Sequence, residues 1–522
     1  MLLISTGLTL LPIILVLYLL AFRKMPTHTG ALIGWAVAAV LSVAFFATPI
    51  EVAVRASLQG ILVSLPISMM TLLAIMQITY MEKAGCLRRI AIFLKTLAPS
   101  NQGIQTMLVN VSAGTVLVSM GCAPPSVLPP VLKGMGYDNR MSIILPVLGF
   151  DAFCTYAMLA APLVTYCDLT GVTLVQAAQI FAKYMPVMAV LVCFAVLYVV
   201  GGWAMIKKCW FAGLVSGLVS GGVAYAIAYI SALNAAIILT GVMSGIVSII
   251  LLLAFLKLQG APIIDKSVLT DEEREIERSI SLLKALSPWL ILLGCLVIVA
   301  FVNPVDQLLR VKLAMPVTLI PGSVVNLRIL WNAYFWIVAS TLLSIPVLRP
   351  GKAQLREVVR IWGKRGLKPF VSAFVFFSLG YVMTYSGYQI LPDGNWVLPD
   401  QLQNMLGVLA EGSARVFGSL YTLIAAPLGL FAGFITSSEA SALAMFAKYN
   451  ILTAEKLGMD ALAITAATGV AAGIASIISP AKLQSAAATI DAQGEENNLL
   501  KQTIVIALLL TVAVVILCFL FS

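Results

Sequence analysis

Charged residues are scarce in this sequence, and histidine is almost absent. Of 522 residues, 32 are Lys or Arg, 22 are Asp or Glu and one is His, so 10% of the chain is charged and 61% is hydrophobic. Soluble domains carry roughly 25% charged and about 45–50% apolar residues. The composition therefore excludes soluble enzymes, nucleic-acid-binding proteins, secreted disulfide-rich domains and disordered chains. It predicts an all-α membrane protein with about 12 transmembrane helices.

The sequence also lacks the spaced residues that metal sites, nucleotide sites and hydrolases require. Its eight cysteines show no paired spacing, and those inside apolar runs, such as Cys154, are expected to pack as small hydrophobic residues. It contains no Gly-x-x-x-x-Gly-Lys-Ser/Thr loop and no His-Glu-x-x-His, and His28 is its single histidine. We therefore expect no enzymatic activity, no cofactor and no metal, and an ion gradient as the energy source.

The loops between apolar runs indicate the orientation of the chain. Arg23 and Lys24 follow the first apolar run, which predicts a retained helix with its N-terminus outside. Segment 349–368 is rich in Lys and Arg and is expected inside, whereas the acidic segment 389–414 is expected outside. Segment 303–330 disagrees with this rule, because it is placed outside but contains three basic residues. The predicted spans are 2–22, 30–48, 57–80, 141–163, 184–204, 210–231, 235–256, 286–302, 331–348, 369–388, 460–480 and 500–521.

A charged stretch near the middle divides the chain into two transmembrane halves. We expect residues 1–256 to form the N-terminal half, 257–285 a charged cytoplasmic linker and 286–522 the C-terminal half. Each half contains one apolar stretch too broken for a plain span: Gly, Pro and Cys interrupt 105–132, and polar residues interrupt 416–447. They are expected to form two re-entrant hairpins that enter from opposite sides, which indicates a probable inverted repeat. The alternative is two ordinary kinked helices.

Four charged residues lie inside or at the mouths of apolar runs. Asp151 and Glu439 interrupt hydrophobic sequence, and a carboxylate there costs about 3 kcal/mol or more, so it normally marks a pathway. Both are candidates for proton coupling, although each is also explained by a structural acid bonded to hydroxyls. Lys482 and Lys183 are candidates to attract an anion, although each side chain is equally able to extend to the interface. The candidate substrate-binding residues are Thr155, Lys183, Thr436, Ser437, Ser438, Ser441, Ser479 and Lys482.

The order of several motifs resembles the bacterial L-lactate permease family. Leu148-Gly-Phe-Asp-Ala looks like the family's turn before an asparagine-containing span, and Phe434-Ile-Thr-Ser-Ser-Glu-Ala-Ser is similar to its Phe-Leu-Thr-Gly-Ser-Asp-Thr-Ser. Ile478-Ser479-Pro480 resembles the family's Ile-Ser-Pro-Gln. The sequence departs from the pattern where the family asparagine is Asp151 and a family lysine is Ser476. Either the charges have been relocated within one cavity, or the substrate has changed.

By that resemblance the chain is expected to carry lactate or a related 2-hydroxy acid, such as glycolate, with protons across the bacterial inner membrane. The predicted partners are a small carboxylate, protons and the lipid bilayer, with no nucleic acid. The alternatives are a transporter of another small organic anion, an anion channel, a membrane scaffold or an intramembrane enzyme.

Overall fold

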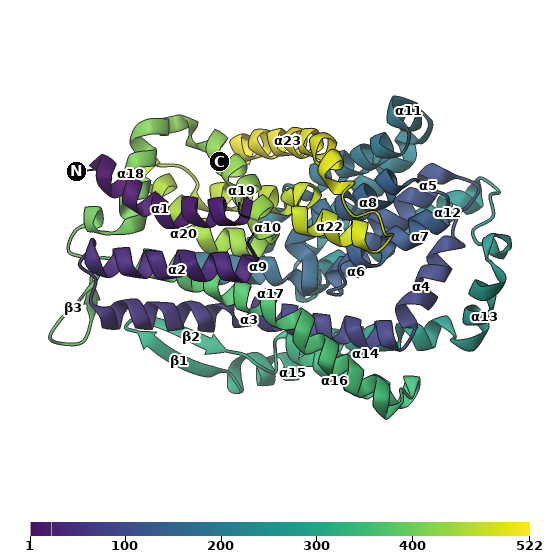
Figure 1. The fold of residues 1–522 in the computed structure, drawn as a ribbon, viewed down its shortest axis with the longest axis horizontal. Helices are drawn as coiled ribbons and strands as arrows, with labels where there is room; N and C mark the ends of the chain where they lie inside the picture. Colours follow the sequence, from purple (N-terminus) through teal and green to yellow (C-terminus); the bar gives the residue numbers. More distant parts are fainter. Residues whose placement is uncertain (1, 22, 24, 522) are drawn as a thin grey trace.

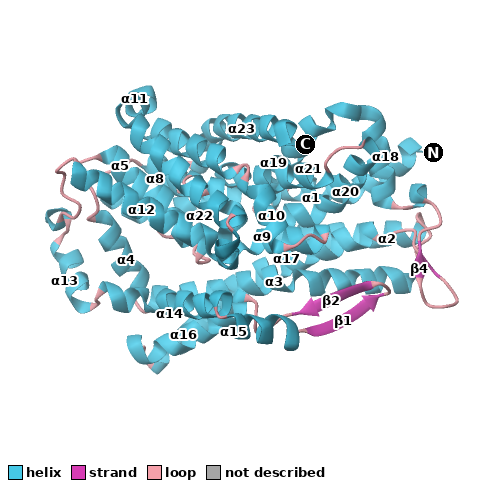
Figure 2. Ribbon diagram, turned by 180° about the vertical axis from the view of Figure 1, so that it is seen from behind, coloured by secondary structure: helices cyan, strands magenta, loops and turns pink. Residues whose placement is uncertain are grey.

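The structure, a computed structural model, describes residues 2–21, 23 and 25–521 and is almost entirely helical (Figure 2). Phe22 and Lys24, which belong to the predicted first span and its basic flank, lie outside the described residues. Ten described helices are long and apolar enough to cross a membrane, and three shorter apolar helices accompany them. This confirms an all-α membrane protein, while the count of twelve spans stays a prediction.

The helices follow one another along the chain, and its division into two halves and a linker stays a prediction. The N-terminal half contains α1 (Leu2–Ala21), α2 (Thr27–Ala44), α3 (Ile50–Lys83), α4 (Cys86–Lys95), α5 (Gln102–Thr106), the π-helix η1 (Met107–Ala113), α6 (Gly114–Ser119), the 3-10 helix η2 (Pro124–Ser126), α7 (Leu128–Gly134), α8 (Asn139–Leu148), the 3-10 helix η3 (Asp151–Tyr156), α9 (Ala157–Thr170), α10 (Leu174–Ala182), α11 (Met185–Tyr229), η4 (Ser231–Leu239) and α12 (Thr240–Leu258). The linker contains η5 (Lys266–Val268) and α13 (Asp271–Ser279). The C-terminal half contains α14 (Leu282–Phe301), α15 (Asn303–Gln307), the π-helix η6 (Leu308–Lys312), α16 (Ala333–Leu348), α17 (Lys352–Thr384), η7 (Gln401–Gln403), α18 (Met405–Phe417), η8 (Gly418–Leu420), α19 (Tyr421–Thr436), α20 (Glu439–Leu457), α21 (Ala461–Ile474), η9 (Ala475–Ile478), α22 (Pro480–Ala488) and α23 (Glu496–Phe521).

The longest contact between the two halves is the antiparallel pair α3 and α17. Gly60 near the start of α3 lies against Ser378 near the end of α17, and the Trp362 indole donates a hydrogen bond of 2.8 Å to the Leu72 carbonyl. The basic segment 349–368, expected as a loop, is mostly the first half of α17. It stays helical because its charges find partners on α3, including the Lys83–Glu357 ion pair of 2.8 Å.

Helix α11 contains two of the predicted spans. Its backbone leaves the helical region at Gly201 and Gly202, and the chain then returns along itself. Gly217 packs against Val190 in the other leg, and Gly221 packs against Pro186. The residues predicted as spans 184–204 and 210–231 therefore form two antiparallel legs.

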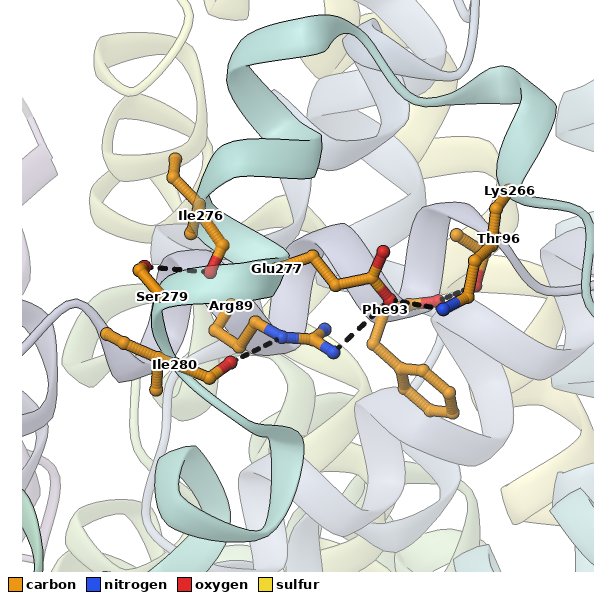
Figure 3. A network of polar contacts seen from close by, with 8 residues as sticks. All are labelled: Arg89, Phe93, Thr96, Lys266, Ile276, Glu277, Ser279 and Ile280. Atoms are coloured by element: carbon orange, nitrogen blue, oxygen red, sulfur yellow. Dashed lines mark hydrogen bonds and ion pairs between the residues drawn. The ribbon is translucent and has the colours of Figure 1, made fainter.

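The central linker is a docked element with structure of its own. Helix α13 lies beside α4 at the end of the molecule remote from the N-terminus (Figure 1). Arg89 of α4 donates 2.9 Å to the Ile280 carbonyl and pairs with Glu277 at 3.5 Å, and Lys266 pairs with the same acid at 2.9 Å (Figure 3). Lys95 pairs with Glu273 at 2.8 Å. The acidic residues expected in a solvated connector thus hold the linker onto α4.

Two small β-hairpins, which were not predicted, lie at the end of the molecule that carries the N-terminus (Figures 1 and 2). Strands β1 (Met315–Ile320) and β2 (Ser323–Leu327) pair antiparallel with Met315 opposite Leu327, and β3 (Gln389–Ile390) pairs with β4 (Trp396–Val397). The segments 303–330 and 389–414 therefore share one end with the N-terminus. The linker and α4 lie at the opposite end. The side of the membrane that each end faces, and with it the outside placement of segment 303–330, stays a prediction.

Candidate functional site

The first candidate segment is a long break between helices α8 and α9. Helix α8 ends at Leu148, and Gly149 packs closely against the π-helix η1, where an added Cβ would stand 2.7 Å from the Asn110 carbonyl carbon. The chain continues as η3 and then passes through three consecutive left-handed residues, Met158–Ala160, with φ of 48°, 55° and 60°. Each costs roughly 1–2 kcal/mol. Strain of this kind concentrates at functional sites.

The second candidate segment is the break between α21 and α22. Helix α21 tightens into the 3-10 turn η9, and Ser479 is extended with φ −67° and ψ 116°. Pro480 then starts α22, where its missing N–H costs nothing because the first helical N–H groups have no partner within the helix. The chain therefore changes helix at Ile478-Ser479-Pro480, at the end of the predicted span 460–480.

The two breaks meet at the centre of the protein. The Cys154 thiol of η3 donates to the Gly473 carbonyl at 3.4 Å and lies 3.5 Å from the Ser476 hydroxyl. Only a glycine permits this approach, because a Cβ at Gly473 would lie 2.7 Å from the Cys154 Cβ. Residues more than 300 positions apart thus form one site.

Two buried carboxyl groups face this junction. Asp151 is 2% exposed, and although the Ile477 amide lies beside it, neither of its oxygens accepts a hydrogen bond from a described residue. Glu439, the first residue of α20, is 6% exposed, and its Oε1 accepts 2.8 Å from Thr155. Its Oε2 has no hydrogen-bond partner in the described part of the chain. Since an unsatisfied ionised carboxylate is costly to bury, these oxygens require a proton or a ligand.

Lys482, in the first turn of α22, is the lysine that interacts with these two acids. Its ammonium donates to Ser476 and lies 5.4 Å from the centre of the Phe150 ring. It interacts electrostatically with both Asp151 and Glu439, but no ion pair joins it to either of these described residues. The predicted charges Asp151, Glu439 and Lys482 therefore lie together.

The predicted hydroxyl groups divide into two roles. Thr436 accepts from the Ser438 amide at 3.3 Å, and Ser438 accepts from the Ser441 amide at 3.3 Å, so both shape the turn into α20. Ser437, held at φ 58°, instead places its hydroxyl 2.6 Å from that of Ser479. This pair links the α19–α20 break to the α21–α22 break. Ser437 and Ser479 are therefore better placed than Thr436 and Ser438 to replace their mutual hydrogen bond with a hydrogen bond to the substrate.

Lys183 is the predicted site residue that the structure does not bring to this cluster. It caps α10, is exposed, and places its ammonium 5.6 Å from the Phe521 ring at the end of α23.

A cavity of about 1300 Å³ extends from the linker to the C-terminal part of α22, and Asp151, Glu439 and Lys482 are not among the residues that line it. It is lined by Gly121, Ala123 and Ser126, by Ser485 of α22 and Thr489 directly after that helix, and by Arg88 and Lys95 of α4. Ser126 and Ser485 lie 3.2 Å apart, which joins the first interrupted segment to α22. The interruptions predicted within 105–132 and 416–447 thus both lie next to the junction.

Sequence reasoning missed Cys154, Gly473 and Ser476. Cys154 lies in an apolar run and was interpreted as helix packing, and Gly473 lies in a run of small residues typical of close helix contacts. Ser476 carried a signal, since it stands where the resembling family has a lysine. Among the described residues, no group of three or more His, Cys, Asp and Glu side chains is placed to hold a metal ion.

Comparison with known proteins matches this chain to a family over nearly its whole length. The family model described as L-lactate permease matches residues 5–522. An L-lactate permease of Bacillus subtilis (strain 168) is 23% identical over 561 residues, covering 99% of this chain and 96% of the relative. One from Salmonella typhimurium is 22% identical, covering 97% and 94%. A glycolate permease GlcA of Escherichia coli (strain K12) is 23% identical over 216 residues, covering 41% and 38%.

Proposed function

The chain belongs to the L-lactate permease family, and from this premise we propose that it is a proton-coupled secondary transporter of lactate or a related 2-hydroxy monocarboxylate such as glycolate. The observation that carries the proposal is the junction of two broken helices, where Asp151 and Glu439 have oxygens that find no hydrogen-bond partner among the described residues, beside Lys482. The names of the relatives, permeases for L-lactate and for glycolate, support this substrate class.

The substrate carboxylate binds at the start of α22. The first N–H groups of a helix and its dipole favour an anion, and Lys482 in the first turn adds a full positive charge. Ser479 and Ser437, which are bonded to each other, offer two hydroxyl groups at the same place. A 2-hydroxy acid has a carboxylate for Lys482 and a hydroxyl for these serines. Thr155 of η3 donates a hydrogen bond to Glu439, and Ser441 lies in the first turn of α20.

Asp151 and Glu439 carry the transported proton. Each lies where an ionised carboxylate has incomplete hydrogen bonding, so protonation removes the cost of burial. Binding of the anion at Lys482 weakens the attraction between this lysine and the two acids, which favours uptake of a proton together with the substrate. Release of the anion restores that attraction and expels the proton. Substrate and proton movement are thereby coupled through one lysine.

The order of elements supports an inverted repeat around this site. Helix α3, α4, an interrupted segment and the broken helix α8–α9 follow one another in the first half. Helix α17, α18, an interrupted segment and the broken helix α21–α22 follow one another in the second. Because α3 and α17 run antiparallel, the two series have opposite directions. This is the arrangement in which transporters hold substrate at the membrane midplane.

We place the protein in the bacterial inner membrane with the linker in the cytoplasm. The basic residues of the linker end, including those at the start of α17, support this orientation. The cavity lined by Arg88 and Lys95 then opens inward, toward the cytoplasm.

Uptake into proteoliposomes tests the proposal. Purified protein is reconstituted, a pH gradient (acidic outside) is imposed, and the uptake of labelled L-lactate and glycolate is followed with and without a protonophore. We expect saturable accumulation that the protonophore abolishes. Uptake that ignores the gradient contradicts proton coupling, conductance without accumulation indicates a channel, and failure to transport either acid contradicts the substrate class.

A further inference from the structure

A second cavity, of about 200 Å³, lies at the end of the molecule opposite the linker. It is bounded by α3 at Leu62–Pro66, by Val164 and Asp168 of α9, by Tyr381 of α17 and by strand β2 with the turn that follows it. Both cavities adjoin α3, since residues Ile75–Glu82 further along this helix line the large one. The small cavity is therefore separate from the site described above.

Arg328 is the cation of this cavity. It follows β2, and its carbonyl accepts hydrogen bonds from the Asn332 amide at 2.9 Å and the Asn332 side chain at 2.8 Å, which holds it in a tight turn. Its Nε is buried without a hydrogen-bond partner in the part of the chain that the structure describes. The neighbouring acid, Asp306, is occupied by Arg310 at 2.9 Å and by the Trp331 indole at 2.9 Å.

Asp168 provides the opposite charge across the same cavity. It interacts electrostatically with Arg328, but the two described side chains form no ion pair. The Arg328 guanidinium and the Asp168 carboxyl group therefore line the same cavity without pairing with each other, and its volume of about 200 Å³ fits a small molecule. The β2 wall is fixed to α3, because Gln59 donates 3.2 Å to the Ser323 hydroxyl.

We infer that this cavity is an outer recognition site for a 2-hydroxy monocarboxylate, in which Arg328 binds the carboxylate and Asp168 accepts the hydrogen bond of the 2-hydroxyl group. The chemistry fits because a guanidinium binds carboxylates in a bidentate manner, and Asp168 rejects an acid that has no hydroxyl to donate. This role also explains why segment 303–330 keeps basic residues at the outer end: Arg310 neutralises Asp306, and Arg328 faces the cavity. The inference rests on the proposed function for its substrate class.

The test measures transport from each side separately. In proteoliposomes, Arg328→Gln is expected to raise the KM for external L-lactate roughly ten- to hundredfold, while the KM for internal L-lactate in efflux changes less than twofold. Arg328→Lys, which keeps the charge without the planar fork, is expected to give an intermediate rise. Arg310→Gln is the matched control, because it removes an arginine of the same segment that pairs with Asp306. An unchanged external KM, or equal rises on both sides, overturns the inference.

Asp168→Ala tests the hydroxyl contact independently. Competition by propionate, which lacks the 2-hydroxyl, is compared with competition by unlabelled lactate at the outer face. We expect the preference for lactate to fall about five- to tenfold, whereas Asp393→Asn in the β3–β4 turn leaves it unchanged. A preserved preference overturns the role of Asp168. If the wild-type protein transports neither lactate nor glycolate, both the proposed function and the outer site are contradicted. If the wild-type protein transports these acids but the variants at Arg328 and Asp168 leave the KM and the preference unchanged, only the outer site is contradicted.

Discussion

Two clusters of charge in this molecule differ in how their acids are partnered. At the linker, Glu272, Glu273 and Glu277 each pair with a cation of α4 or of the linker (Figure 3 shows the Glu277 part). At the helix junction, Asp151 and Glu439 retain oxygens that no described residue hydrogen-bonds, beside Lys482, with which they form no ion pair. Paired charges at a solvent edge fasten one element to another, whereas buried charges left incomplete are available to a proton or an anion. This difference distinguishes the charged residues that stabilise the fold from those that are available for transport.

The largest expected effect comes from neutralising Asp151. Asp151→Asn keeps the size of the side chain but cannot take up a proton, so lactate accumulation driven by a pH gradient should fall at least roughly tenfold while lactate–lactate exchange persists. Uptake and counterflow in proteoliposomes measure the two. Asp393→Asn is the control in an exposed turn. If accumulation is unchanged, Asp151 does not carry the proton.

Lys482 and Lys95 offer a direct comparison of the two clusters. Lys482→Gln removes a charge-assisted contact to the substrate worth about 1.5–3 kcal/mol, so the KM for lactate should rise about tenfold or more. Lys95→Gln removes a linker ion pair and should leave the KM within twofold while lowering the Tm. Equal effects of both variants on the KM would remove the distinction between the clusters.

The close approach of the two breaks gives a packing test of the junction. In Gly473→Ala the new methyl group would stand 2.7 Å from the Cys154 Cβ and 3.0 Å from Glu439 Oε2, so we expect a loss of about 1–3 kcal/mol in stability and slower transport. Gly222→Ala is the matched control, because a Cβ there meets nothing within 4 Å. Thermal unfolding in detergent and initial transport rates report the outcome. A variant as stable and active as the control would show that the junction is not tightly packed.

The smallest effect is expected at the linker and depends on pH. Partial burial raises the pKa of Glu273, but the hydrogen bonds from Lys95 outweigh it and hold the pKa below its usual value of 4.5. Because the folded pKa is the lower one, the pair stabilises the protein above about pH 4.5, and the contribution is lost as the pH falls through the folded value. Glu273→Gln should cost less than about 1 kcal/mol at pH 7, and still less at pH 4. An equal loss at both pH values would contradict the ion-pair explanation.

Much of the fold was predictable because the bilayer limits the choices. Apolar runs of span length must be helices, and breaks made by Gly121–Pro125 or by Ser437 and Ser438 cannot lie inside a regular helix exposed to lipid. The helical structure of most of segment 349–368, the docking of α13 and the β1–β2 hairpin were not predictable in this way. They depend on partners far along the chain, such as Glu82 for Arg365.

The sequence by itself determined that this is a helical membrane protein, which segments are interrupted, and that Asp151, Glu439 and Lys482 are out of place in apolar runs. The small number of charged residues made this possible, because in such a hydrophobic chain each charged residue within an apolar run is easily recognised. Only the tertiary structure decided that η3 and η9 meet, that Lys183 lies elsewhere, and that Arg328 faces Asp168 across a cavity. Contacts between residues hundreds of positions apart depend on how the helices pack, and no local pattern of residues records that packing.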